Sequence, residues 1–154
     1  MKVFTKEWYY YTSAYNDKTK PYLDYAKENL PQWYNDFSVH DNQIKKVIRE
    51  NNLIILNSLY DDYKSTEYQL KFYDPIVIED CEMENAWCLY DEVYLTENGC
   101  EYHLMVMDFN DNDIRNYFTV KCSDIELDMN GKTFRMIGGS DSERLFDEPK
   151  ESDE

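Results

Sequence analysis

Two patterns of apolar and polar residues divide the chain. Residues 1–34 place apolar side chains at helical spacing, and residues 37–137 alternate apolar and polar side chains as strands do. The strand-like runs outside the two hairpins described below cover residues 43–49, 53–60, 68–73 and 76–81. The sequence therefore predicts an α+β domain, with two N-terminal helices packed on a mostly antiparallel, meander-rich sheet of about seven or eight strands. An open sheet, a sandwich and a partial barrel are all compatible with this pattern.

The two predicted helices are rich in aromatic residues. The first helix would begin at the N-cap residue Thr5 and extend to about Tyr15, where the following Asn-Asp pair predicts its end. The second would begin near Pro21, which suits a first helical turn, and end before Pro31. Aromatic side chains at this spacing are typical of a helix face that docks on a core.

Two Asn-Gly pairs predict β-hairpins, because a two-residue type I′ turn needs positive φ at both positions. At residues 130–131 the register gives one apolar and one polar face, with the pairs Leu127–Phe134, Ile125–Met136, Glu126–Arg135 and Asp128–Thr133. At residues 98–99 both faces are largely apolar, which predicts central strands, with the pairs Leu95–Tyr102, Val93–Leu104, Tyr94–His103 and Glu92–Met105.

The hairpin at residues 98–99 leads to the main pocket hypothesis. Tyr90, Glu92, Tyr94 and His103 would share one face, where Glu92 could act as a base in a polar pocket. Alternatively, Glu92 is paired with His103 or another base and the tyrosines only pack. Because neighbouring side chains on a strand point to opposite faces, Asp91 and Glu92 cannot act as a carboxylate pair.

His40, Asp41 and Trp87 are further candidate binding residues. A His-Asp metal phosphohydrolase needs an earlier histidine and helical surroundings, whereas the only other histidine of this chain, His103, comes later. The structural interpretation is that Asp41 closes a turn before a strand and that His40 satisfies a buried backbone group.

A calcium loop is weakly indicated by Asp108, Asn110 and Asn112, which fit the first three ligand positions of the twelve-residue pattern. Asp113 replaces the required glycine and Thr119 replaces the bidentate glutamate. The four cysteines form no CxxC pair, so buried free thiols are expected and a zinc site is the minor alternative. Since no phosphate-binding loop, GxSxG or HExxH occurs, no cofactor or metal is expected and no catalytic residues are assigned.

The net charge of −16 is concentrated in one half of the chain. Residues 74–154 contain 22 acids and 6 bases, whereas residues 1–73 contain ten of each. Such a field repels phosphate backbones and anionic membranes and attracts basic proteins or divalent cations. Residues 138–154 are acidic and nearly devoid of apolar side chains, so residues 1–137 are expected to form one domain followed by a disordered tail. The N-terminal residues have no apolar core of a secretory signal, which predicts a cytoplasmic location.

Three short motifs resemble a bacterial family known only as a domain of unknown function, number forty eighty-five, found mainly in Gram-positive Firmicutes. They are residues 4–9 (FTKEWY), residues 37–41 (FSVHD) with the strand at 53–55, and residues 87–93 (WCLYDEV). The resemblance covers most of residues 1–137 and implies a small cytoplasmic protein with no known activity. The His-Asp-then-strand pattern is also loosely similar to small acidic immunity-type proteins of bacterial toxin systems.

Two functions from different classes are predicted. The first is a non-enzymatic acidic module, such as an immunity-type or inhibitor protein, that sequesters a basic protein partner. The second is a small-ligand binder or enzyme with a pocket around Tyr90, Glu92, Tyr94 and His103. A housekeeping protein without a dedicated partner is a third reading, and the oligomeric state is left open.

Overall fold

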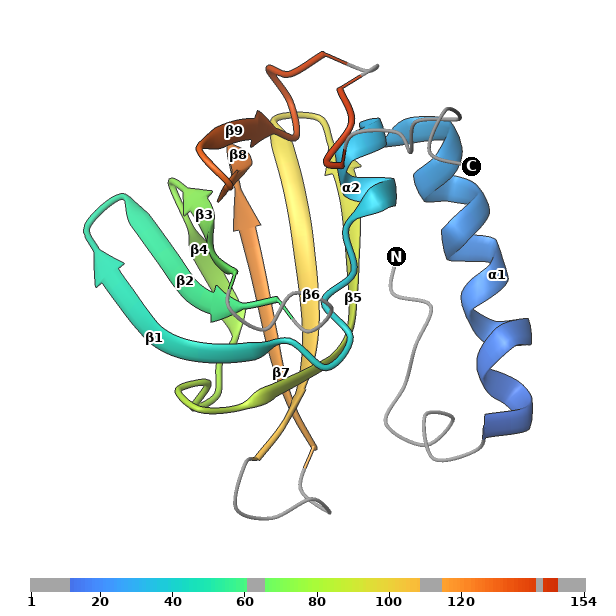
Figure 1. The fold of residues 1–154 in the computed structure, drawn as a ribbon, viewed down its shortest axis with the longest axis horizontal. Helices are drawn as coiled ribbons and strands as arrows, with labels where there is room; N and C mark the ends of the chain where they lie inside the picture. The colour runs from blue at the N-terminus through green and yellow to red at the C-terminus, as the bar shows by residue number, and fades with distance from the viewer. Residues whose placement is uncertain (1–11, 61–65, 109–114, 141–142, 147–154) are drawn as a thin grey trace, which may run out of the picture.

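A single antiparallel sheet dominates the computed structural model, which describes residues 12–60, 66–108, 115–140 and 143–146 (Figure 1). Within these residues the strands are β1 (Gln43–Glu50), β2 (Leu53–Leu59), β3 (Glu67–Tyr73), β4 (Ile76–Glu79), β5 (Trp87–Thr96), β6 (Gly99–Met107), β7 (Arg115–Cys122), β8 (Asp124–Met129) and β9 (Lys132–Arg135). Their order across the sheet is β4-β7-β6-β5-β1-β2-β3-β8-β9, so β4 and β9 are the edges of an open sheet.

The predicted α+β class is wrong, because the fold is mostly β. The described helices are α1 (Thr12–Asn29) and the short α2 (Gln32–Asp36). Helix α1 continues through Asn16 and Asp17, where the sequence predicted a break, and contains Pro21 in its interior. Asparagine and aspartate each cost less than about 1 kcal/mol in a helix interior, which is too little to end one. The predicted N-cap lies outside the described residues.

The core is built mainly by the sheet, which curves until its inner faces approach each other. The ring of Phe72 on β3 lies 4.9 Å from that of Tyr102 on β6 and 6.0 Å from that of Phe118 on β7. The helices add only a few buried side chains to this core, among them Tyr22, Ala26, Trp33 and Tyr34. Curvature of one open sheet therefore buries the apolar faces that a packed helical layer was predicted to cover.

The β8–β9 hairpin confirms the predicted register. Glu126 faces Arg135, Leu127 faces Phe134 and Asp128 faces Thr133. Asn130 and Gly131 both have positive φ, at 55° and 74°, as the predicted turn requires. Arg135 Nε donates to Glu126 Oε1 at 3.2 Å, which is the expected cross-strand ion pair.

The β5–β6 hairpin is central, as predicted, but its predicted register is wrong by two residues. Thr96 pairs with Gly99, and Glu92 pairs with His103 rather than with Met105. Gly99 is therefore a strand residue and not a turn residue. A Cβ atom there would collide with the backbone carbonyl of Cys122 on β7, so close strand approach requires this glycine.

Residues 143–146 pack against the end of α2. Arg144 donates to Asp36 with both Nε, at 2.8 Å, and Nη2, at 3.2 Å, and the side chain of Leu145 is buried. The disordered tail predicted after residue 137 stays a prediction, and residues 138–140 and 143–146 are its described part. No helix among the described residues has the length and apolarity needed to cross a membrane.

Candidate functional site

Strand β5 carries two neighbouring acids into two different environments. Asp91 faces the main core, where tyrosines from several elements meet, and Glu92 faces the opposite side of the sheet. The alternation of side chains along a strand explains this division, as the sequence predicted.

The structure brings together the four residues of the main pocket hypothesis. Tyr90 donates its hydroxyl to Glu92 Oε2 at 2.7 Å, and Tyr94 donates to Glu92 Oε1 at 3.1 Å. The side chain of Glu92 is buried, with 0% exposure. The ring of His103 lies 6.0 Å from that of Tyr94, edge to face. Because both carboxylate oxygens of Glu92 already accept a hydrogen bond, its surroundings are those of a satisfied buried acid.

His103 is held by neighbours that the sequence did not assign to the cluster. Its Nε2 lies 2.6 Å from Glu101 Oε2, and its Nδ1 lies 3.3 Å from the Thr119 hydroxyl. Glu101 precedes it on β6, and Thr119 is its partner across the β6–β7 ladder. The two ring nitrogens of His103 therefore both have polar neighbours in this cluster.

Asp91 ends a chain of hydrogen bonds that begins at the backbone. The N–H of Val93 donates to Tyr22 Oη at 2.6 Å, Tyr22 donates to Tyr34 Oη at 3.0 Å, and Tyr34 donates to Asp91 Oδ1 at 3.0 Å. Tyr22 comes from α1 and Tyr34 from α2, so both helices are tied to β5 through this chain.

The second oxygen of Asp91 is less well satisfied. Asp91 Oδ2 and the Tyr102 hydroxyl are both buried, and neither makes a well-formed hydrogen bond within the part of the chain that the structure describes. Burial raises the pKa of Asp91 to about 7, even though the neighbouring hydroxyls of Tyr102 and Tyr34 lower it. Burial also raises the pKa of these two tyrosines well above 10.0, so both stay neutral donors.

A small hollow of about 160 Å³ reaches Asp91 between α1, the segment after α2, and β5. Its lining is mostly aromatic and aliphatic, and it contains Tyr22, Leu23, Ala26, Tyr34, Asn35, Phe37, Ser38, Val39, His40, Leu89, Tyr90 and Asp91. A perturbed acid in a mainly apolar hollow is the usual physical mark of a binding or catalytic position.

His40 and Asp41 occupy a turn at the edge of this hollow. Asn42 N–H donates to the Val39 carbonyl at 2.9 Å, and Asp41 has a φ of 65°. His40 Nδ1 lies 3.1 Å from the Leu89 carbonyl, so it satisfies a backbone acceptor of β5. These placements agree with the structural interpretation of the His-Asp pair. Trp87 lies at the start of β5, opposite Met107 and Gln43.

The weak calcium candidate cannot be placed as a unit. Asp108 is described, but Asn110 and Asn112 lie outside the described residues. Among the residues that the structure does describe, no group of three or more histidine, cysteine or acidic side chains could hold a metal ion. All four cysteines are free thiols, as predicted, and Cys88, Cys100 and Cys122 are buried.

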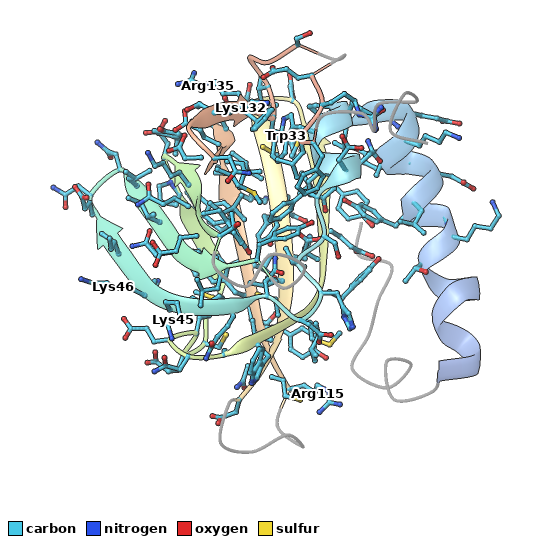
Figure 2. All side chains as sticks on the ribbon, viewed as in Figure 1. Trp33, Lys45, Lys46, Arg115, Lys132 and Arg135 are labelled. Atoms are coloured by element: carbon cyan, nitrogen blue, oxygen red, sulfur yellow. The ribbon has the colours of Figure 1, made fainter. Side chains whose placement is uncertain are left out.

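A wider hollow, about 700 Å³, lies over the half of the sheet that contains β1, β2, β3, β8 and β9. Lys45 and Lys46 of β1 and Lys132 of β9 line it (Figure 2), as do the acids Glu67 and Asp128. Within the same face, Lys71 Nζ donates to Asp128 at 2.7 Å and lies 3.6 Å from Glu126. The opposite charges in this hollow largely neutralise one another, and sequence analysis did not single it out.

The acidic half of the chain begins at an edge strand with exposed apolar residues. In β4, Ile76 is 64% exposed and Ile78 is 57% exposed. Residues 74–84 contain no base, and their acids are all exposed: Asp74, Glu79, Asp80, Glu82 and Glu84. Asp80 binds Arg49 of β1 through two hydrogen bonds of 2.9 and 3.1 Å. We call residues 74–84 the acidic edge.

Sequence reasoning missed the Asp91 site because its tyrosines are distant in the chain. Tyr22, Tyr34 and Tyr102 belong to α1, α2 and β6, and no short motif connects them. The sequence pattern did show that Asp91 and Glu92 are acids at apolar strand positions, but it did not distinguish one from the other.

One family model matches residues 3–115, which include α1, α2 and β1–β6 and end at the first residue of β7. The match is shorter than the resemblance expected over residues 1–137. No curated protein and no solved structure matches the chain. Because the family match covers well over half of the 154 residues and contains both acids of β5, the chain belongs to the DUF4085 family, described as proteins of unknown function.

Proposed function

We propose that the protein is a binding module that holds a basic protein partner along the acidic edge, as immunity-type and inhibitor proteins hold their targets. The observation that carries the proposal is an edge strand with two exposed isoleucines, within a segment, residues 74–84, that contains five acids and no base. An extended segment of a partner would add to β4 as a further strand, with main-chain hydrogen bonds providing affinity.

The apolar and charged parts of the acidic edge have separate roles in this proposal. Ile76 and Ile78 provide apolar area at the centre of the contact, where water would be displaced. Glu79, Glu82 and Glu84 attract basic side chains and speed the encounter, and this attraction weakens as salt rises. Asp80 pairs with Arg49 of β1, and Lys121 of β7 lies opposite Ile76, so the five acids of this segment outnumber the bases beside them.

The test uses a labelled octapeptide that alternates lysine and valine as the probe, followed by fluorescence anisotropy. We expect binding at about 50 mM salt that weakens strongly at about 500 mM. A matched peptide that alternates glutamate and valine should not bind. The triple change Glu79→Gln, Glu82→Gln and Glu84→Gln should weaken binding at least about tenfold.

The matched control neutralises three exposed acids elsewhere, Glu28→Gln, Glu50→Gln and Glu67→Gln, and changes the net charge by the same amount. It should leave affinity within about twofold. Equal weakening by both triple variants would mean that only net charge matters, and would overturn the assignment to β4. A double variant, Ile76→Lys with Ile78→Lys, should abolish binding because it places like charges on the contact.

A further inference from the structure

We propose that the acidic segment at residues 147–154 docks in the lysine-lined hollow over β1, β2, β3, β8 and β9 of the same chain. Lys45 and Lys46 of β1 and Lys132 of β9 border this hollow (Figure 2). The strands β7, β6 and β5 separate it from β4, where the acidic edge begins. The inference therefore does not rest on the binding of a partner at the acidic edge.

A β-bulge brings two consecutive lysines to the hollow. The pairing of β1 with β2 skips Lys45, which is the extra residue between Ile44 and Lys46. Neighbouring residues of a regular strand point to opposite faces, whereas a bulge re-aims a side chain. Both lysines consequently line the hollow, and both are exposed.

The acids and bases of the hollow nearly balance in number but differ in their availability to a ligand. Asp128 has both carboxylate oxygens occupied, because Oδ1 accepts from the Thr133 hydroxyl and Oδ2 accepts from Lys71 Nζ, each at 2.7 Å. The other acid of the lining is one exposed glutamate at the start of β3. Within the part of the chain that the structure describes, Lys45 and Lys46 make no ion pair. These two lysines therefore retain capacity for further carboxylates.

The floor of the hollow suits an extended peptide. The strand register places five polar residues in one row across the sheet, and all of them line the hollow: Lys46, Asn57, Gln69, Asp128 and Thr133. The amide side chains in this row can donate and accept hydrogen bonds, as peptide groups require. A volume of about 700 Å³ lies within the range of pockets for drug-sized ligands and leaves room for a few residues of a peptide.

The described part of the C-terminal region places the start of the segment near the hollow. Two hydrogen bonds from Arg144 to α2 fix the chain shortly before Phe146, the last described residue. The ring of Phe146 lies 6.0 Å from that of Tyr60, which lies 6.1 Å from the ring of Tyr68 in the lining of the hollow. The Phe146 ring is thus no more than about 12 Å from the Tyr68 ring. Eight extended residues span up to about 26 Å, so the segment can reach the lysines.

The charge of the segment complements the hollow. Residues 147–154 read DEPKESDE, with five acids and one base. A protein with a net charge of −16 repels such a segment over most of its surface, whereas the exposed lysines of the hollow attract it. Because the segment belongs to the same chain, its effective concentration is about millimolar, so a weak contact is still populated.

The test compares backbone amide NMR spectra of the full chain with those of a variant that neutralises four acids of the segment: Glu148→Gln, Glu151→Gln, Asp153→Asn and Glu154→Gln. In the unchanged protein, raising the salt concentration from about 25 to about 500 mM should shift the amides of Lys45, Lys46 and Lys132, because the docked carboxylates leave them. In the variant, these shifts should be at least about threefold smaller.

A second pair of variants examines the lysines. Lys45→Gln with Lys46→Gln should release the segment, so that the amides of residues 147–154 respond to salt at least about threefold less than in the unchanged protein. Lys27→Gln with Lys121→Gln is the matched control, because it removes two exposed lysines from α1 and β7 and changes the net charge equally. The control should keep the salt response within about twofold of that of the unchanged protein.

Three outcomes would overturn the proposal. The first is an equal salt response of the hollow in the unchanged protein and in the variant with a neutralised segment. The second is an equal effect of the two lysine pairs, which would mean that only net charge matters. The third is a shift that grows with protein concentration between about 50 and 500 µM, which would place the segment in a second copy instead of its own chain.

Discussion

Asp91 and Glu92 are neighbours on one strand, lie in mainly apolar surroundings, and differ in how well their carboxylate oxygens are satisfied by hydrogen bonds. Tyr90 and Tyr94 each donate to a separate oxygen of Glu92. Asp91 receives one good hydrogen bond, from Tyr34, while its Oδ2 and the Tyr102 hydroxyl lie close without a well-formed bond. A hollow also reaches Asp91.

The difference shows that burial alone does not identify a functional acid. A buried carboxylate with two donors is a structural group, because its desolvation is offset by hydrogen bonds. A buried carboxylate with an oxygen left over retains part of that cost, and its pKa rises. Substitutions at the two positions should therefore behave differently.

The largest expected effect is on the pH dependence of folding. The pKa of Asp91 is raised from 3.8 to about 7 in the folded protein. The folded state thus holds this proton to higher pH than the unfolded chain does, so the stabilising contribution is complete below about pH 4 and is lost as pH rises through 7. The loss amounts to about 4 kcal/mol.

Asp91→Asn removes this contribution, so the free energy of unfolding of the variant should fall less than that of the unchanged protein between pH 4 and pH 8. Urea unfolding at several pH values measures the difference between the two curves. Parallel curves would show that Asp91 has an ordinary pKa in the folded protein, and the contrast with Glu92 would disappear.

The next effect is on stability at Glu92. Glu92→Ala removes the acceptor that the Tyr90 and Tyr94 hydroxyls use and leaves a void in a packed region. We expect a loss of about 3 kcal/mol in the free energy of unfolding at pH 7. Glu97→Ala, at an exposed turn position of the same hairpin, should change it by no more than about 0.5 kcal/mol. A Glu92→Ala variant as stable as Glu97→Ala would contradict the structural role.

The smallest effect separates the tyrosines of the two faces. Tyr34→Phe and Tyr94→Phe each delete one hydroxyl that donates to a carboxylate, and each should cost about 1 kcal/mol. Only Tyr34→Phe should raise the pKa of Asp91 further, since the Tyr34 hydrogen bond lowers it. NMR titration of the Asp91 carboxyl in both variants measures this, and equal changes in the two would refute the separation of the faces.

The two Asn-Gly pairs show how much of the fold the sequence could predict. At Asn130 and Gly131 the turn geometry is local, so the dipeptide predicted both the turn and the register. Gly99 is required by the close approach of the Cys122 backbone, which is a contact between strands that no local sequence pattern reveals. This contact places Gly99 in β6 rather than in the turn, so the observed register differs from the one that the dipeptide predicted.

The predicted residues of the Glu92 cluster nevertheless came together, because a shift of two residues keeps every side chain on its face. The Asp91 site could not be predicted in the same way. Its tyrosine neighbours come from two helices and the adjacent strand β6, and the docking of the helices on β5 brings them to one acid. The predicted fold class was wrong because the alternation of side chains does not reveal the curvature of the sheet.

The most direct test of the contrast within β5 is a carboxyl-resolved NMR titration of the Asp91 side chain. We predict a midpoint at about pH 7. A midpoint near the ordinary aspartate value of 3.8 would contradict the account.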